Sequence, residues 1–349
     1  MDIKTSPVWI LEPKEGFEGL KLHPSQPLPE LNDHSCLIQI DAVSLNYRDV
    51  AIPKGQYPMA FRGRIIPCSD GAATVIKTGP AVTRFAIGDR VCTLFNPSHQ
   101  SGYFTPDTRK YSLGSSADGT LRKYAVFHET ALVSQPKNIT SLQAATLPCA
   151  GVTAWNAFYG IADRKLQPGS YVLTQGTGGV SLIAIQIALA VGATVIATTS
   201  SPEKANRLKE MGVQHVINYR ETPNWGEVAR QLTPENRGVD HILEVGGEAT
   251  IRQSLKAIKM EGVISIIGFL GGANNAPQCS FQECLSTLAI VRGTSVGSKE
   301  QFKELNAFIQ SHNIQPIVDS NVFDFQDAPR AFQYLWDQKQ WGKVVIHIK

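Results

Sequence analysis

The chain has 349 residues, of which 42% are hydrophobic and 18% are charged, and its formal net charge is +3. This length and composition allow one large or two medium domains with a sizeable core, and they exclude intrinsic disorder, collagen and coiled coil. No run of Lys or Arg reaches four, and Gln186 and Gly192 interrupt the most apolar stretch, 180–197. We therefore expect neither nucleic acid nor a membrane as a partner.

The six cysteines indicate a reducing compartment. None of them forms a Cys-x-x-Cys pair, and a chain of this length does not depend on disulfides for its core. The first residues carry neither a long apolar segment nor the character of a transit peptide. We expect reduced thiols and a cytoplasmic protein.

The first 135 residues contain short strand-like segments separated by turn residues, with little helical periodicity. The predicted strands cover residues 37–43, 72–79, 90–95, 123–128 and 131–135. This pattern is typical of an antiparallel, barrel-like domain. Residues 96–120 form a long connection, for which the sequence leaves open a functional loop or a disordered surface excursion.

From residue 171 onward, apolar runs rich in Val and Ile alternate with helix-like segments. The predicted strands are 171–175, 194–198, 215–219, 241–246, 263–269 and 290–296, and the predicted helices are 180–191, 202–211, 224–232 and 250–259. Six alternating strands predict a doubly wound parallel sheet, and hence an α/β fold. Residues 343–348 form one more strand, which can join this sheet or the first domain. We expect it in the first domain, because six strands already complete the sheet.

A glycine-rich turn follows the first of these parallel strands. Gly176 permits a tight turn, and Gly178 allows the backbone to approach a pyrophosphate, with Gly179 and Val180 opening the next helix. Ser181 replaces the third glycine of the usual pattern and is small enough for close packing. The position between a strand and a helix favours a dinucleotide site over a merely tight turn.

The end of the next strand distinguishes the two nicotinamide cofactors. An NAD site usually has an acid there, but residues 181–202 contain no Asp or Glu. Thr199 takes the place of the acid, and Ser200, Lys204 and Tyr219 can donate hydrogen bonds to a 2′-phosphate. The alternative is that Lys204 is only an exposed helix residue. The pattern predicts NADPH.

Several motifs together give the chain a family resemblance. They are the segment 79–91 with its Gly-Asp-Arg-Val turn, the Asn46-x-x-Asp49 segment, and LPCAGVTAW at 147–155. On these motifs the chain resembles the medium-chain dehydrogenase/reductase superfamily over nearly its whole length. The resemblance implies a GroES-like β-barrel catalytic domain (residues 1–135 and 298–349) and a Rossmann NADP-binding domain (residues 136–297).

The resemblance also bears on metal binding. Zinc members of the superfamily have Cys, His, Glu and Cys where this chain has Asn46, Ser69, Asp70 and Cys149. One thiolate cannot form the three-ligand site that catalytic zinc needs. The four clustered cysteines of a structural zinc lobe are also missing from 96–120. We expect no metal, and we interpret Cys149 as a small buried residue near the cofactor.

In the zinc-free branch, the Asn-x-x-Asp segment is followed by Gly-x-Tyr-Pro, as it is here by Gly55 to Pro58. This branch is similar to quinone oxidoreductases, enoyl reductases and zinc-type alcohol dehydrogenase-like proteins. It implies that Asn46 binds near the nicotinamide ribose and that Tyr57 faces the substrate, which makes these two the predicted catalytic residues. The alternative for Tyr57 is a residue that closes the turn. Further cofactor-binding positions carried over from the family are Thr153, Gly246, Phe269, Ser295, Val296 and Lys343.

The leading functional hypothesis is a zinc-independent, NADPH-dependent reductase that adds hydride to an activated C=C bond or a carbonyl, as in an enone, an enoyl compound or a quinone. Two alternatives stay open: a zinc-free NADP-dependent alcohol dehydrogenase or ketone reductase, and a nucleotide-binding scaffold without turnover. The expected partners are a small-molecule substrate and a second copy of the chain. By analogy with the family, the homodimer joins two nucleotide-domain sheets at the sixth strand, 290–296.

Overall fold

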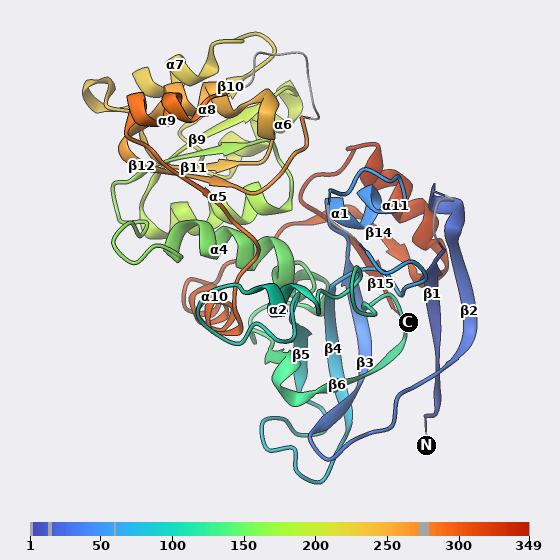
Figure 1. The fold of residues 1–349 in the computed structure, drawn as a ribbon. Helices are drawn as coiled ribbons and strands as arrows, with labels where there is room; N and C mark the ends of the chain where they lie inside the picture. Colours follow the sequence, from blue (N-terminus) through green and yellow to red (C-terminus); the bar gives the residue numbers. More distant parts are fainter. Residues whose placement is uncertain (1–2, 13–15, 59–60, 272–278, 349) are drawn as a thin grey trace. The chain divides into compact units, whose positions relative to one another are not determined.

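The computed structural model describes residues 3–12, 16–58, 61–271 and 279–348. The chain divides into two compact units (Figure 1). Unit 1 comprises Met1–Val152 with Val296–Lys349, and unit 2 comprises Thr153–Ser295. No helix in these described ranges is long and apolar enough to cross a membrane.

Unit 1 is built on strands that pair mainly antiparallel. Its strands are β1 (Thr5–Leu11), β2 (Leu20–Pro27), β3 (Ser35–Ser44), β4 (Asp70–Thr78), β5 (Arg90–Thr93), β6 (Tyr124–His128), β7 (Leu132–Ser134), β14 (Val318–Asp324) and β15 (Lys343–His347). β1 and β2 form a hairpin. The larger sheet runs in the order β14-β15-β3-β4-β5-β7, with β6 paired to β3. This arrangement confirms the five strands predicted for the first 135 residues.

The C-terminal strand β15 returns to unit 1, as predicted. It pairs antiparallel with β3, where Val345 lies opposite Ser44, and parallel with β14. β3 is buried along most of its length because the β15 and β4 neighbours and the core side chains of the unit cover it. This pairing therefore carries residues from the end of the chain to the end of β3, next to Asn46.

Short helices and turns complete unit 1. They are α1 (Tyr47–Ala51), α2 (Pro106–Arg109), α3 (Ser141–Ala144), a π-helical turn (Leu147–Gly151), α10 (Lys299–Ser311), α11 (Ala328–Trp336), and 3-10 turns at Gly16–Gly19, Glu129–Ala131 and Phe325–Asp327. The predicted long connection 96–120 is not a disordered excursion. It contains α2, buries Thr120 completely, and joins Ser112 to Asn96 by a hydrogen bond.

Unit 2 contains the predicted six-stranded parallel sheet, in the order β10-β9-β8-β11-β12-β13. Its strands are β8 (Tyr171–Gln175), β9 (Thr194–Thr199), β10 (His215–Asn218), β11 (Val239–Glu244), β12 (Ile258–Ile266) and β13 (Ile290–Gly293). Numbered from β8, this is the 3-2-1-4-5-6 order of dinucleotide-binding sheets, in which the order reverses beside the first strand. The glycine-rich turn follows that strand.

The helices of unit 2 begin and end where their sequence signals lie. They are α4 (Val152–Tyr159, whose first residue belongs to unit 1), α5 (Gly179–Val191), α6 (Pro202–Glu210), α7 (Trp225–Gln231), α8 (Ile251–Ala257) and α9 (Phe281–Thr287), with 3-10 turns at Pro234–Asn236 and Gly247–Ala249. The Ser201 side chain caps α6 by accepting from the Lys204 N–H. Gly192, with φ of +87°, ends α5. α8 stops before the predicted Lys259 because β12 already pairs with β11 at Ile258.

The unit boundaries differ from the predicted domain limits. The first lies after Val152 rather than after residue 135, and the second lies after Ser295 rather than after residue 297. The segment 136–152 belongs to unit 1 because hydrogen bonds tie it there. Asn138 donates to the Ile309 carbonyl (3.3 Å), and the Cys149 N–H donates to Asp70 Oδ2 (3.1 Å).

Candidate active site

Asn46 and Asp49 lie at the N-terminal end of α1 in unit 1. Asn46 precedes the helix, and its backbone N–H donates to Asp49 Oδ2 at 2.8 Å. Arg48 Nε lies 3.6 Å from the other oxygen of Asp49. Burial raises the pKa of Asp49 to about 6, although the Arg48 charge and the Asn46 N–H act in the opposite direction. The Asn-x-x-Asp spacing therefore serves first to fix the backbone that carries Asn46.

The Lys343 ammonium joins the two ends of unit 1 at this point. It donates to Asn46 Oδ1 and to the Leu45 carbonyl, each at 2.5 Å. Its nitrogen also lies 3.8 Å from Asp70 Oδ2, and both side chains are buried. A buried cation that faces a buried carboxylate and two further acceptors is well compensated. Lys343, predicted to bind the cofactor, is thus placed beside Asn46.

The positions that hold zinc in other members carry a different donor set here. Ser69 Oγ donates to Asp70 Oδ1 at 2.5 Å, and Asn46 Nδ2 donates to Ser69 Oγ at 3.5 Å. Burial, followed by the charge of Asp70, raises the pKa of the Cys149 thiol to about 12. In the described ranges, no group of three or more His, Cys, Asp or Glu side chains can hold a metal ion. An amide, a hydroxyl, a protonated thiol and a single carboxylate that faces the Lys343 ammonium do not fit zinc.

Cys68 holds Ser69 and Asp70 in place through an unusual backbone conformation. Its φ is +69°, a left-handed value that non-glycine residues seldom adopt. Gly114 and Gly119, from the 96–120 connection, lie against the Cys68 backbone so closely that a Cβ at Gly119 would meet the Cys68 carbonyl oxygen at 1.8 Å. Sequence analysis missed this support, whose only signal was glycine in a long loop.

Tyr57 lies close to the same cluster. Burial raises the pKa of its phenol, and a hydrogen bond with the Arg48 guanidinium partly opposes that rise. The charge of Asp49 acts in the same direction as burial. Arg48 itself lies over the Phe95 ring at 3.9 Å and donates to the Leu113 carbonyl. Unit 1 therefore brings Tyr57, Asn46 and Lys343 together around one buried polar network, in which the phenol is protonated at neutral pH.

The glycine-rich turn of unit 2 has an open face. Gly176 has a φ of +71°, which favours glycine, and Gly178 precedes α5. A Cβ at either position would meet no atom within 4 Å, so space is available beside the backbone. Ser181 Oγ donates to the Gln175 carbonyl at 2.7 Å and closes the helix onto the strand. With Gly179 and Val180 in the first turn of α5, the turn fits a pyrophosphate.

A buried Gln–Glu pair, which sequence analysis missed, links this turn to the end of β11, the strand beside β8 in the sheet. Gln175 Nε2 donates to Glu244 Oε2 at 2.7 Å, and Gln175 Oε1 accepts from the Gly246 N–H at 3.2 Å. Glu244 Oε1 accepts from the N–H groups of Gly246 and Gly247 at 2.9 and 3.0 Å. The pair fixes the ends of β8 and β11 relative to each other. Its sequence signal was a polar residue at the last position of each buried strand.

The four residues predicted to contact a 2′-phosphate gather at the ends of β9 and β10. The Tyr219 N–H donates to the Thr199 carbonyl at 3.2 Å, and Thr199 Oγ1 accepts from the Ser201 N–H at 3.3 Å. Ser200 precedes α6, which carries Lys204 in its first turn, and Tyr219 is 41% exposed. The nearby Glu221 carboxylate accepts from Asn218 Nδ2 at 2.6 Å. The strand end thus presents hydroxyls and a cation, with the Glu203 and Glu221 carboxylates close by in the chain.

The remaining predicted cofactor positions are divided between the units. Thr153 is buried in α4, and Gly246 lies just beyond the end of β11. Phe269 is 37% exposed beyond β12, and Ser295 is exposed at the end of unit 2. Val296 begins the second part of unit 1, with a φ of +44°. A positive φ is strained for a β-branched residue and marks Val296 as a specially held position.

Two family models match the chain. The alcohol dehydrogenase GroES-like domain matches residues 32–137, and the zinc-binding dehydrogenase model matches residues 179–311. The first covers most strands of unit 1. The second begins with α5 and ends with α10, and so includes most of the parallel sheet.

Known proteins resemble the chain over nearly its full length. A zinc-type alcohol dehydrogenase-like protein of Schizosaccharomyces pombe is 41% identical, over 95% of this chain and 96% of its own. An NADPH-dependent alkenal/one oxidoreductase of Arabidopsis thaliana, a chloroplastic protein, is 27% identical over 99% of this chain and 80% of its own. The crystal structure of an NAD-dependent alcohol dehydrogenase superimposes with a TM-score of 0.86 at 28% identity, covering 98% of this chain and 100% of that one.

The fold, the two matched domains and the extent of these similarities agree with one another. A GroES-like unit assembled from both ends of the chain and a six-stranded parallel sheet with an open glycine turn are the two parts of one architecture. The chain therefore belongs to the medium-chain dehydrogenase/reductase superfamily and is an oxidoreductase of that family.

Proposed function

We propose that this chain is a zinc-independent, NADPH-dependent reductase that delivers hydride to an activated C=C bond or a carbonyl of a small molecule. The observation that carries the proposal is the Lys343 ammonium. It hydrogen-bonds Asn46 Oδ1 and lies 3.8 Å from Asp70 Oδ2, among the positions where zinc members place their ligands. A lysine there supplies positive charge without a metal.

Elemental analysis tests the zinc-independent part of the proposal. Protein prepared without a metal-affinity tag should contain far less than one zinc per chain, and chelators should leave activity unchanged. Zinc at one per chain, with activity lost on its removal, would contradict the proposal.

The preference for NADPH is supported by the end of β9. A 2′-phosphate facing an acid at about 4 Å would lose about 4 kcal/mol per unit charge pair at an effective dielectric constant near 20. Thr199 stands in place of that acid, and Lys204 is nearby. The Arabidopsis relative uses NADPH by name, whereas the superimposed alcohol dehydrogenase is NAD-dependent. Titration of the protein with NADPH and with NADH tests this preference. Equal or tighter binding of NADH would refute it.

Bound NADPH supplies the hydride, and the protein's own residues orient the reactants and manage the proton. After reduction of an enone, negative charge develops on the carbonyl oxygen. The Tyr57 phenol, whose pKa is raised by burial, is a protonated donor that can polarise that oxygen or give it a proton. Asn46, held by Asp49 and Lys343, is fixed to orient the nicotinamide ribose. Water or a ribose hydroxyl can share the proton delivery.

The substrate class follows from a screen of NADPH oxidation. The panel contains enones, quinones, aldehydes, simple ketones and imines at matched concentration. A preference for enones or quinones supports the reductase proposal, and a preference for simple ketones, with alcohols oxidised in reverse, supports the alcohol dehydrogenase alternative. Tight NADPH binding without oxidation of any acceptor would indicate a scaffold.

We also propose that the protein is a homodimer joined at β13, the last strand of the parallel sheet. An end strand offers unpaired backbone groups to a second sheet. Large apolar side chains lie exposed on the neighbouring elements: Phe281 (96%), Leu285 (72%), Leu288 (53%) and Met260 (64%). Light scattering should give twice the chain mass for the wild type and a smaller mass for Phe281→Glu. Ile87→Glu, an exposed position of unit 1, should change nothing.

A cytoplasmic location is proposed as well. All six cysteines are free thiols, and three of them are buried. A chain with this many unpaired thiols suits a reducing compartment. Fractionation of cells that express the tagged protein tests this.

A further inference from the structure

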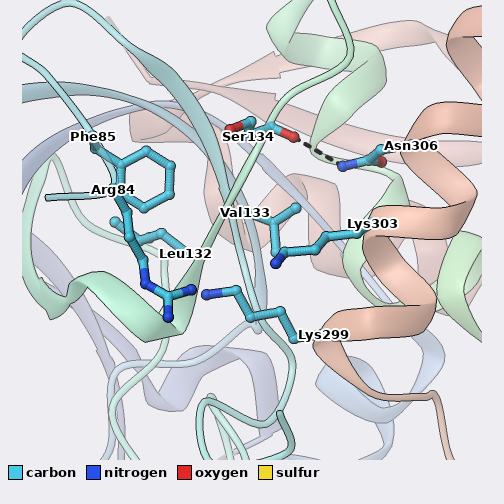
Figure 2. Close-up of a pocket in the computed structure, with 8 residues that line it drawn as sticks. All are labelled: Arg84, Phe85, Leu132, Val133, Ser134, Lys299, Lys303 and Asn306. Carbon is cyan, nitrogen blue, oxygen red and sulfur yellow. Dashed lines mark hydrogen bonds between the residues drawn. The ribbon is translucent and has the colours of Figure 1, made fainter. Parts of the chain in front are cut away.

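A cavity of about 360 Å³ lies within unit 1, outside the polar network around Lys343. Its walls come from the segment after β4, from β7 and from α10 (Figure 2). The lining residues are Arg84, Phe85, Leu132, Val133, Ser134, Lys299, Lys303 and Asn306. None of them belongs to the predicted catalytic or cofactor-binding residues.

Three basic side chains converge on this cavity. Figure 2 shows the ends of Arg84, Lys299 and Lys303 directed toward the same space. Lys299 and Lys303 lie one turn apart on α10, where like charges repel. In the part of the chain that the structure describes, neither Arg84 nor Lys303 forms a side-chain ion pair or hydrogen bond. The cluster is therefore electrostatically unfavourable as long as no anion lies within it.

Lys299 is the buried member of the cluster, with 4% of its surface exposed. Its ammonium donates to the Thr130 carbonyl at 2.6 Å. Burial, together with the charges of Arg84 and Lys303, lowers the pKa of Lys299 to about 8, and Glu129 is the group that acts in the opposite direction. At neutral pH Lys299 is still charged, so the cavity has a cationic wall.

Glu129 does not neutralise the cluster. Its Oε2 accepts from the Thr83 and Arg84 N–H groups at 3.1 and 3.0 Å, and its Oε1 lies 3.3 Å from His34 Nδ1. Both carboxylate oxygens are thus already engaged. Three cations against one carboxylate leave two positive charges in excess.

Asn306 lies on the same wall of the cavity. Its Nδ2 donates to the Ser134 carbonyl at 2.9 Å. The residue is 8% exposed, and its Oδ1 is buried and accepts no hydrogen bond from the described residues. Phe85, Leu132 and Val133 complete the wall with apolar surface.

We propose that this cavity binds a small phosphate monoester, with the phosphate held by Arg84, Lys299 and Lys303. A phosphate monoester is close to a dianion at neutral pH and so matches the two uncompensated charges. Guanidinium and ammonium groups give charge-assisted hydrogen bonds to its oxygens. The apolar wall of Phe85, Leu132 and Val133 accepts a compact carbon skeleton. The volume lies within the range of small-molecule sites.

The phosphate monoester has two conceivable sources, a free metabolite or the 2′-phosphate of the dinucleotide. We assign the cavity to a free ester, because its lining residues are separate from Thr199, Ser200, Lys204 and Tyr219. Calorimetric titration with phenyl phosphate, in the presence and absence of saturating NADPH, distinguishes the sources. We expect one molecule per chain with a dissociation constant unaffected by NADPH. Competition between the two would overturn the assignment to a free ester.

Variants of the exposed Lys303 test the site without disturbing the core. Lys303→Glu should weaken phenyl phosphate binding about 10–100-fold, because it removes one charge-assisted contact and adds repulsion. Lys21→Glu, an exposed change of equal charge on β2, should leave binding unchanged. Circular dichroism checks that both variants fold. Absence of saturable binding, or an equal loss in both variants, would refute the proposal. Because the readout is binding rather than turnover, its failure is distinguishable from failure of the proposed reductase activity.

Salt and pH give a second test on the wild type. Binding should weaken as ionic strength rises, and it should weaken further above pH 8 as Lys299 loses its proton. The neutral probe phenol should bind at least tenfold more weakly than phenyl phosphate. Equal affinity for the two would mean that only the apolar wall binds, which contradicts the proposal.

Discussion

Lys343 and Lys299 occupy the same unit and are almost equally buried, with 5% and 4% of their surfaces exposed, yet their surroundings have opposite character. Lys343 faces Asp70, Asn46 Oδ1 and the Leu45 carbonyl. Lys299 has one carbonyl partner and two cationic neighbours, Arg84 and Lys303. The first cation is compensated by the chain itself. The second is compensated only in part, by Glu129, and it lines a cavity in which an external anion can supply the missing negative charge.

The largest effect should come from breaking the compensated pair. Lys343→Met leaves the Asp70 carboxylate buried without its cation and should lower the free energy of unfolding by about 3–5 kcal/mol. Chemical denaturation measures this. Lys343→Met combined with Asp70→Asn should recover part of the loss, because no charge then stays buried alone. A stable Lys343→Met variant would show that the pair is not coupled.

The Tyr57 phenol tests whether the compensated network is also the catalytic one. We expect Tyr57→Phe to lower turnover about 10–100-fold while NADPH affinity stays nearly unchanged, because only the proton donor is lost. Steady-state kinetics and a cofactor titration measure the two effects separately. Wild-type turnover would make Tyr57 only a wall of the pocket, and loss of NADPH binding would support its role in closing the turn.

Removal of Lys299, the less compensated cation, should act in the opposite direction from removal of Lys343. Lys299→Met should raise the free energy of unfolding at pH 7 by about 1–2 kcal/mol in phosphate-free, low-salt buffer, since each pKa unit corresponds to about 1.4 kcal/mol and packing of the ammonium offsets part of the total. The Thr130 carbonyl keeps a donor, Gln100 Nε2 at 3.1 Å. Destabilisation instead would mean that Lys299 is structural.

The pH dependence of the free energy of unfolding of the wild type and of Lys299→Met reports the titration of Lys299. The pKa of Lys299 is about 8 in the folded chain, below its ordinary value of 10.5, so the unfolded chain binds more protons between these values. Wild-type stability should therefore rise with pH in this window relative to Lys299→Met, and the advantage of the variant should disappear by about pH 10.5. Parallel denaturation curves at pH 7 and pH 10 measure this. If the two proteins differ in unfolding free energy by the same amount at pH 7 and pH 10, Lys299 does not titrate in this window and the prediction is wrong.

The smallest effect concerns a third lysine, at the end of β9. Lys204→Ala should weaken NADPH binding about 5–10-fold and leave NADH binding unchanged, because only one of the two carries the 2′-phosphate. Lys209→Ala, toward the other end of α6, is the matched control and should change neither. An equal loss for both cofactors would show that Lys204 does not distinguish them.

The sequence by itself determined the parts that depend on local pattern. Six apolar runs with helical segments between them were enough to predict the parallel sheet, and Gly176 to Ser181 predicted the turn after its first strand. The absence of Asp and Glu from residues 181–202 could also be seen directly. These features were readable because a strand, a turn and the helix after it lie within a few residues of each other.

Only the tertiary structure decided which distant polar groups meet. β15 pairs with β3 and brings Lys343 to Asn46, and α10 brings Lys299 to Arg84. The same holds for Gln175 and Glu244, and for the hydrogen bonds that keep residues 136–152 in unit 1. The sequence around a charged side chain does not show which distant residue will lie next to it. Whether burial leaves it paired or exposed to a ligand is set by strand order and helix placement, which long-range packing fixes.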